Sequence, residues 1–209
     1  MMKFLYCSVF AIIICLQSVK GQVFVGVKGG LNYVNNDTNY DNGNPGGFSV
    51  DFNYRLAYHF GGFATFPLTD ILKVRSELLL SQKGNTSQLR NSSIDLRLFY
   101  INLPVLLQFL IEDKVGIEVG PDFGYLISAK TKGSQLDGTN LKYLYENIDI
   151  GVIFGGRYFV SDVLSIGLHY SHGISSTHEI LDFDENAFLL GEASFKNRSC
   201  QLSVSYRLN

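Results

Sequence analysis

The sequence predicts an all-β fold, an eight-stranded antiparallel up-and-down transmembrane β-barrel. Three observations lead to this prediction. Apolar side chains recur at every second residue in eight segments, the connections between these segments alternate between long and short, and the polar faces combine charges with glycines. The length of 209 residues fits one domain. The formal net charge of -2 offers no basic field to a nucleic acid, so no nucleic-acid partner is expected.

Residues 1–21 have the pattern of a secretory signal peptide. Lys3 precedes an apolar run, Phe4–Leu16, which is shorter than the roughly 20 residues of a membrane-spanning helix. We therefore expect cleavage after this segment and a barrel domain formed by residues 22–209. Cys200 is the one cysteine that cleavage leaves, so neither an internal disulfide nor a cysteine-based metal site is expected.

Strict alternation of apolar and polar residues identifies the strands. From Phe48 to Phe66 every second residue is apolar or glycine, a period that a helix cannot produce. The stretch Arg97–Phe109 is the least regular, because apolar residues occupy both phases, and there we place five residues on the apolar face: Ile101, Leu103, Val105, Leu107 and Phe109. The predicted strands are Val23–Tyr33, Phe48–Phe66, Leu72–Leu80, Arg97–Phe109, Val115–Tyr125, Ile148–Tyr158, Leu164–Tyr170 and Leu202–Leu208.

The connections between these strands fall into two classes that alternate along the chain. Four are long and polar, and three are tight: the long ones are residues 35–47, 84–95, 127–147 and 174–197, and the tight ones are residues 67–71, 110–114 and 160–163. Alternate connections of an up-and-down barrel lie at the same end, and outer-membrane barrels have long loops outside and short turns in the periplasm. Both chain ends are therefore expected on the periplasmic side.

The polar faces are expected to line the lumen and the apolar faces to contact lipid. The polar faces hold charges of both signs beside glycines. This combination suits the interior of an eight-stranded barrel, where side chains just fill the space. The predicted lumen network consists of Lys28, Arg55, Lys73, Arg75, Glu77, Glu118, Asp122, Asp149, Arg157 and Arg207. The alternative is a soluble lipocalin-like barrel that binds a ligand inside and has its apolar face turned inward.

Aromatic residues near the strand ends are expected to form the two girdles of a membrane barrel. Tyr33, Tyr125 and Tyr170 lie near the long loops, and near the tight turns lie Phe66, Phe109, Tyr158 and Tyr206. The strand beginning at Phe48 is longer than the roughly 10 residues needed to cross a bilayer. The sheet is therefore expected to project beyond the membrane on the loop side.

Several segments together resemble the PorT-like outer-membrane β-barrel family of Bacteroidota. They are Leu72–Gly84, Tyr100–Phe109, Val119–Ser128, Asp149–Tyr158, Gly167–Ile174 and Leu202–Leu208, in the same order as in the family. The resemblance implies an eight-stranded barrel in the outer membrane of a Gram-negative bacterium, and one class of members is linked to protein secretion and gliding. The chain departs from many such barrels at its end, where Tyr206 to Asn209 lack a terminal aromatic residue.

One short motif raises an enzymatic alternative. His169 and Ser171 share a strand face, and with Glu179 they could supply a base, a nucleophile and an orienting acid. The motif is similar to the His-x-Ser element of outer-membrane lipid A deacylases, which are also eight-stranded. The period, however, places His169 and Ser171 in the lumen, so a packing role is expected.

No metal site or cofactor is predicted. His169 and His172 point to opposite faces of one strand and cannot bind one metal ion together. An acidic segment could hold a divalent cation that bridges to lipopolysaccharide, although solvated charges explain it equally: Glu179, Asp182, Asp184, Glu185 and Glu192.

The expected function is that of a structural or recognition protein of the cell envelope, without enzymatic activity and linked to secretion. Its surface loops, or the projecting rim of its sheet, would contact a partner or ligand. The expected partners are outer-membrane lipid and lipopolysaccharide and an envelope or secretion-system protein. A diffusion channel is not expected in so small a barrel.

Overall fold

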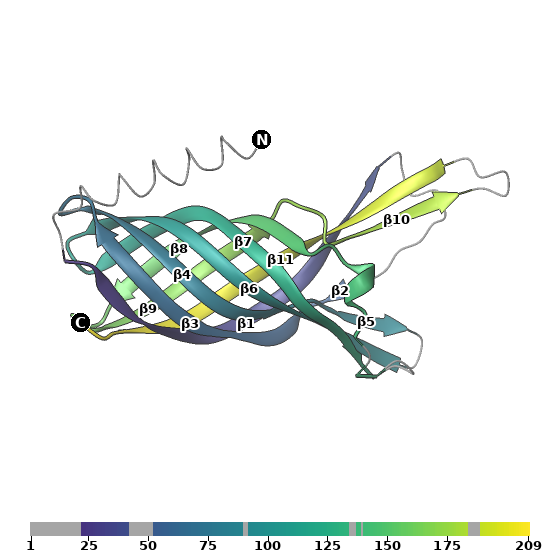
Figure 1. Cartoon of the computed structure of the whole chain (residues 1–209), viewed down its shortest axis with the longest axis horizontal. Helices are drawn as coiled ribbons and strands as arrows, with labels where there is room; N and C mark the ends of the chain where they lie inside the picture. Colours follow the sequence, from purple (N-terminus) through teal and green to yellow (C-terminus); the bar gives the residue numbers. More distant parts are fainter. Residues whose placement is uncertain (1–21, 42–51, 90–91, 134–136, 139, 184–188) are drawn as a thin grey trace.

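The computed structural model describes residues 22–41, 52–89, 92–133, 137–138, 140–183 and 189–209. The predicted signal peptide lies outside these residues. Within them, eight antiparallel strands close into a ring, because β1 pairs with both β3 and β11 (Figure 1). The ring strands are β1 (Phe24–Asp41), β3 (Arg55–Pro67), β4 (Leu72–Lys83), β6 (Ser92–Ile111), β7 (Val115–Lys132), β8 (Ile148–Phe159), β9 (Leu164–Gly173) and β11 (Leu189–Arg207). The predicted fold is confirmed.

The two ends of the barrel differ as predicted. Tight turns join β3 to β4, β6 to β7 and β8 to β9 at one end, where β1 also begins and β11 ends (Figure 1). In the second of these turns Glu112 and Asp113 have positive φ angles of 49° and 56°. We call this the turn end and the opposite one the loop end. In outer-membrane barrels the turn end faces the periplasm.

The loop end contains more strand than the sequence predicts. β1 and β11 stay paired as far as Asp41 and Glu192, whereas the β1–β3 pairing ends at Val34 and Arg55. Short elements complete this end: β2 (Phe52–Asn53), β5 (Thr86–Leu89), the 3-10 helix η1 (Lys142–Leu144) and β10 (His178–Phe183), which pairs with β11. All four predicted long loops, residues 35–47, 84–95, 127–147 and 174–197, are therefore partly wrong, because each contains strand residues. Strands that extend beyond the lipid-facing band need no apolar face, so they leave no period of two in the sequence.

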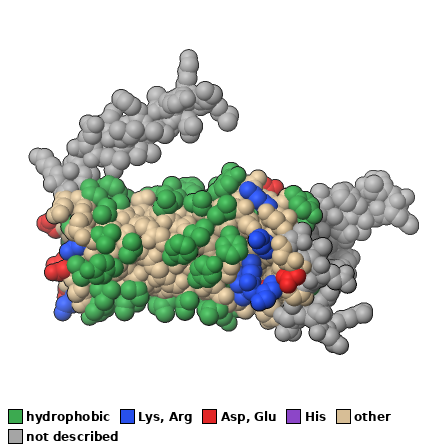
Figure 2. Space-filling model, turned by 60° about the horizontal axis from the view of Figure 1, so that its bottom comes forward, with side chains coloured by type: hydrophobic (Ala, Val, Ile, Leu, Met, Phe, Trp, Pro, Cys, Tyr) green, Lys and Arg blue, Asp and Glu red, His purple; other side chains and the backbone are tan. Residues whose placement is uncertain are grey.

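Side chains alternate across the barrel wall. Leu31 is 50% exposed on the outside, while the next residue, Asn32, is completely buried in the lumen. Apolar side chains cover much of the outer wall (Figure 2). A lipocalin-like barrel would have the reverse arrangement, so that alternative is excluded. Among the described residues no helix has the length and apolar character to span a bilayer.

Close strand contact makes several glycines necessary, and Gly61 is one of them. A Cβ atom on Gly61 would lie 2.0 Å from the carbonyl oxygen of Leu78 on β4. On the adjacent Gly62 the nearest atom would be the carbonyl oxygen of Gly26, 3.5 Å away, which is an ordinary contact. Only the first of these neighbouring glycines is therefore required by packing.

Candidate functional site

The lumen near the turn end is organised around Glu77. Its carboxylate accepts hydrogen bonds from the Lys28 ammonium at 2.6 Å and from Arg75 Nε at 2.7 Å. The Arg157 guanidinium lies 3.6 Å from the same carboxylate. All four side chains are buried. Charges so far from water require partners of opposite sign, and these contacts supply them.

A second carboxylate, Glu118, lies beside this group. Arg157 donates to it through Nε at 2.7 Å and Nη2 at 3.1 Å, a two-point contact that matches the guanidinium to the carboxylate. The Gln108 amide and the His169 ring also contact Glu118. Arg157 therefore joins Glu77 and Glu118 into one hydrogen-bonded layer.

A third group of charges lies closer to the loop end. Lys83 binds Asp149 at 2.8 Å and Asp122 at 3.3 Å. The Asn102 amide donates to Asp122 at 2.9 Å, and the Asn197 amide donates to Asp149 at 2.9 Å. One ammonium thus stands between two carboxylates, and an uncharged amide donates to each of them. We call this group and the two carboxylate centres above the lumen network.

An apolar layer lies in the lumen on the loop-end side of the lumen network. Leu98, Tyr100, Leu126 and Ala129 form a buried cluster, against which Tyr145 of the long β7–β8 connection packs. Burial there raises the pKa of the Tyr145 hydroxyl. The sequence analysis missed this layer, although the apolar residues in both phases of 97–109 were its signal.

Seven of the ten predicted lumen residues lie in the lumen network, and three do not. Arg55 lies at the loop end and donates to the Gln82 side chain and the Lys83 carbonyl. Lys73 and Arg207 lie half-buried at the turn end beside the Phe24 ring. These three predictions are corrected: the residues lie where the lumen opens, so water shares their solvation. Five uncharged members were missed, although they fall on the same inward phase: Asn32, His59, Asn102, Gln108 and Asn197.

The His169 and Ser171 pair lies inside the barrel. The two residues are 2% and 4% exposed, and the carboxylate that His169 contacts is Glu118. Glu179 lies on β10, in the sheet beyond the ring. Neither His169 nor Ser171 reaches the outer wall, where a lipid substrate would lie.

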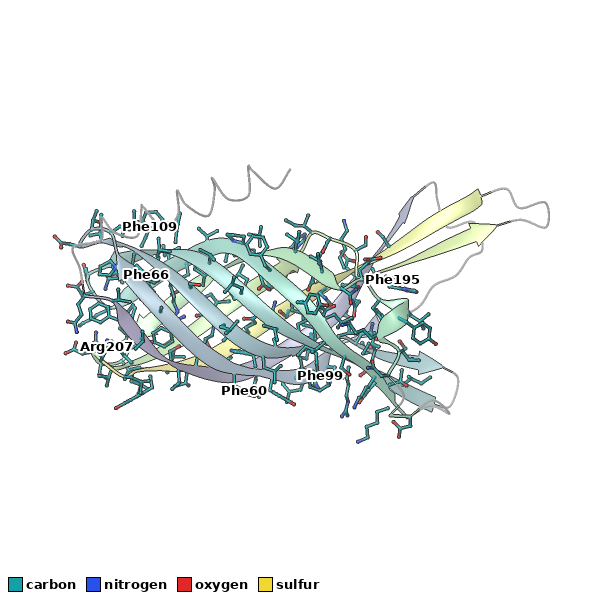
Figure 3. The ribbon with its side chains drawn as sticks, viewed as in Figure 1. Phe60, Phe66, Phe99, Phe109, Phe195 and Arg207 are labelled. Atoms are coloured by element: carbon teal, nitrogen blue, oxygen red, sulfur yellow. The ribbon has the colours of Figure 1, made fainter. Side chains whose placement is uncertain are left out.

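Aromatic side chains predicted for the girdles lie on the outer face. Phe66 and Phe109 lie at the turn end in Figure 3. Towards the loop end Tyr33 stacks on Tyr54 with ring centroids 4.6 Å apart, and Tyr170 packs against Phe154. The remaining members, Tyr125, Tyr158 and Tyr206, are exposed on the same wall. The apolar band is thus bordered by rings at both ends.

Cations gather on the outer wall where the apolar band ends at the loop end. Figure 2 shows them grouped there. Arg97 pairs in register with Lys130, and Asp95 with Lys132, while the pair next to Arg97 and Lys130, formed by Leu98 and Ala129, faces the lumen. Lys142 lies with its ammonium 4.9 Å from the Tyr125 ring centroid. We call Arg97, Lys130, Lys132 and Lys142 the basic cluster; the Asp95 carboxylate lies 3.4 Å from Arg97.

Metal ligands do not assemble in the described residues, where no group of three or more His, Cys, Asp or Glu side chains could hold an ion. Of the predicted acidic segment, Asp184 and Glu185 lie outside the described residues. The backbone of the other three members is placed on β10 and β11: Glu179, Asp182 and Glu192.

The closed ring, polar lumen and apolar outer wall agree with a sequence comparison. Residues 17–179 match the family described as outer membrane protein beta-barrel domain. The chain belongs to this family. It is an outer-membrane β-barrel protein of a Gram-negative bacterium, and the narrower PorT-like assignment stays a prediction. No protein of curated function has a significantly similar sequence.

Solved outer-membrane barrels are similar in fold. Neisserial surface protein A, NspA, has a TM-score of 0.52 and 11% identity, with 90% of this chain and 100% of that chain covered. The attachment invasion locus protein Ail of Yersinia pestis has a TM-score of 0.49 and 13% identity, covering 90% and 100%. OprG of Pseudomonas aeruginosa has a TM-score of 0.49 and 12% identity, with 92% of this chain and 99% of that chain covered. The similarity to NspA supports the barrel fold alone.

Proposed function

We propose that this outer-membrane barrel is a structural and recognition protein that binds a protein of the envelope or of a secretion system. The observation that carries the proposal is the sheet formed by β1, β11 and β10 beyond the ring. Within the described residues β10 pairs with β11 alone, and β1 has no strand partner on its other side after Val34. Free strand edges can accept an added strand from another chain.

The filled lumen also supports a role at the surface. Buried ion pairs and the Leu98 layer occupy the interior, so the barrel is not proposed as a channel. The resemblance of its strand segments to PorT-like barrels supports a partner in protein secretion. We therefore assign partner recognition to the projecting sheet and not to the lumen.

Outer-leaflet lipid is the second proposed partner. The basic cluster borders the apolar band at the loop end, where phosphate groups of lipopolysaccharide would lie. Lysine and arginine side chains bind phosphate by charge-assisted hydrogen bonds. This contact would fix the height and rotation of the barrel and hold the projecting sheet at a constant orientation.

A deacylase activity is the competing proposal, and the position of His169 and Ser171 disfavours it. A lipid acyl chain on the outer wall would have to cross the sheet to reach a side chain in the lumen. We therefore propose a protein without enzymatic activity and without a cofactor.

Photo-crosslinking in intact cells tests the recognition role. A benzophenone amino acid replaces Ile180 on β10, and matched controls carry it at Leu78 on the lipid-facing wall or at Ser161 in a tight turn. A reproducible protein adduct from position 180, absent at position 78, is the expected result. Equal adducts at positions 180 and 78, or none at position 180, would refute the proposal.

A further inference from the structure

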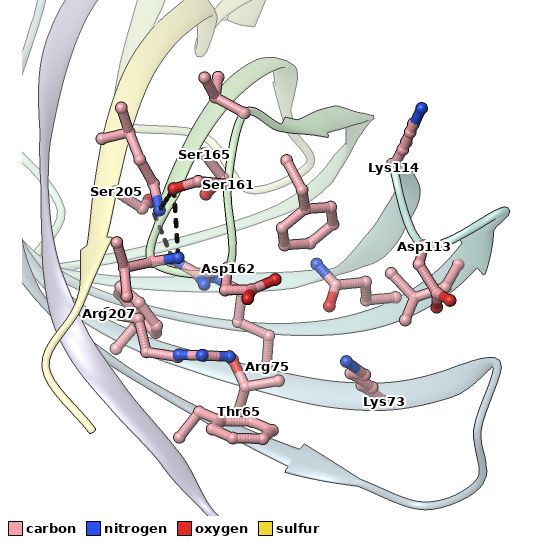
Figure 4. Close-up of a pocket in the computed structure, with 18 of the residues that line it drawn as sticks. Thr65, Lys73, Arg75, Asp113, Lys114, Ser161, Asp162, Ser165, Ser205 and Arg207 are labelled. Carbon is pink, nitrogen blue, oxygen red and sulfur yellow. Dashed lines mark hydrogen bonds between the residues drawn. The ribbon is translucent and has the colours of Figure 1, made fainter.

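A cavity of about 540 Å³ opens at the turn end of the barrel (Figure 4). Its floor includes the side chains of Thr65, Arg75 and Ser205, and its walls include Lys73 and Arg207. The volume falls within the roughly 300–1,000 Å³ of small-molecule sites. Because the turn end faces the periplasm, soluble periplasmic molecules reach this cavity without crossing the membrane.

Two phenylalanine rings that line this cavity form cation–π contacts with its basic side chains. The Arg75 guanidinium lies 3.5 Å from the centroid of the Phe63 ring. The Arg207 guanidinium lies 4.7 Å from the centroid of the Phe24 ring, and the Lys73 ammonium lies 5.7 Å from the same ring. A ring beneath a guanidinium attracts the cation while leaving the N–H groups at its edge free to donate.

The cations differ in what they bind. Arg75 is engaged by Glu77 and also donates to Ser205 at 3.2 Å. Among the described residues, neither Lys73 nor Arg207 has a carboxylate within 4.0 Å or a hydrogen-bond acceptor. The Nε atom of Arg207 is shielded from solvent and lacks an acceptor. A bound anion with an oxygen at this position would give this donor a partner.

Carboxylates also line the cavity, on the tight turns. They are Glu112, Asp113 and Asp162, and none lies within 4.0 Å of the Lys73 ammonium or the Arg207 guanidinium. These charges would repel a highly charged anion. They suit a ligand whose single anionic group binds the cationic wall.

We propose that this cavity is a binding site for a small ligand with one phosphate group, held by Lys73 and Arg207. A tetrahedral phosphate offers several oxygens to an ammonium and a guanidinium at once, including an acceptor for the Arg207 Nε. The group could belong to a soluble phosphate ester or to a phospholipid headgroup. The site lies at the opposite end from the projecting sheet and does not depend on the proposed recognition role.

Phosphate binding can be measured on the mature chain folded in a non-ionic detergent. Titration calorimetry with inorganic phosphate is expected to give saturable binding, and Lys73→Gln or Arg207→Gln is expected to raise Kd about tenfold, since each removes a charge-assisted contact. Phe24→Leu, which keeps both charges but removes the shared ring, is expected to weaken binding less. Lys196→Gln, at the loop end on β11, is the matched control and should leave Kd unchanged.

The outcomes are distinct even if one variant folds poorly. Circular dichroism checks the fold of each variant, and Lys73→Gln serves if Arg207→Gln fails to fold. Competition by phosphoethanolamine but not by a short-chain phosphatidylethanolamine supports a soluble ligand, and competition by the lipid supports a headgroup. Absence of saturable binding, or equal weakening by Lys196→Gln, overturns the proposal.

Discussion

Replacing Glu118 with glutamine is expected to destabilise the barrel strongly. Glutamine has nearly the same shape but removes the charge that the Arg157 guanidinium contacts at two points. Arg157 is itself buried, so it would be left largely uncompensated. Removing one partner of a buried ion pair costs roughly 3–5 kcal/mol.

Remaining contacts place the expected loss at the lower end of that range. Arg157 keeps the Glu77 carboxylate at 3.6 Å and donates to Ser205 at 2.9 Å. A loss of about 3 kcal/mol corresponds to about a 100-fold change in the unfolding equilibrium. Urea unfolding of the protein in phospholipid vesicles, followed by far-ultraviolet circular dichroism, measures it.

Two further variants decide whether the reasoning is right. Glu146→Gln, the same change at an exposed position, should alter the free energy of unfolding by less than about 0.5 kcal/mol. Adding Arg157→Met to Glu118→Gln should recover much of the lost stability, because no unpaired charge then remains at this point. If Glu118→Gln behaves like Glu146→Gln, the lumen network does not contribute as described.

Three other predictions follow from the packing. Gly61→Ala should prevent folding or lower the unfolding midpoint in urea markedly, whereas Gly62→Ala should be tolerated, because only the first Cβ meets a backbone oxygen at 2.0 Å. Leu98→Ala should cost about 2–5 kcal/mol in vesicle unfolding through the cavity it leaves in the apolar layer. Cys200, exposed on the outer wall, should resist a charged maleimide in vesicles and react after denaturation; rapid labelling in intact vesicles would contradict its lipid-facing position.

The sequence predicted the ring well because lipid constrains it. Each spanning strand must show apolar side chains to hydrocarbon on one face, and this imposes a period of two that can be read directly. The parts of β1 and β11 that extend beyond the β1–β3 pairing are not constrained in this way. Their pairing, from Asn35 with Arg198 to Asp41 with Glu192, is defined by the backbone, and a search for alternating apolar residues does not detect it.

The apolar layer of the lumen shows a second limit. The β6–β7 register shifts at Phe99 and Tyr100, which pair with Ser128 and Leu126. Ile127 is therefore an extra residue on β7, and the inward phase changes across it, so that Leu126 and Ala129 both face the lumen. An alternation test assumes one unbroken phase and cannot detect such a bulge.

The sequence predicted which residues face the lumen better than it predicted which of these residues contact each other. The inward phase assigns Glu118 and His169 to the lumen, but their contact joins residues 51 positions apart. Which inward side chains meet depends on the stagger of strands around the closed ring, and alternation within one strand carries no information on it. Lys73 and Arg207 were misplaced for the same reason, because phase gives the face of a strand and not the distance to the mouth.

The charged lumen also has a role beyond filling space. If the interior were as apolar as the outer wall, each strand could present either face to lipid, and a slip of one residue would cost little. With Arg75 or Arg157 on the inner face, the same slip would put a guanidinium into hydrocarbon, at roughly 2–4 kcal/mol near the midplane. A buried ion pair contributes little net stability compared with apolar packing. The lumen network therefore fixes the strand register and determines which face of each strand points inward. Since the network fills the lumen, recognition is left to the two ends of the barrel.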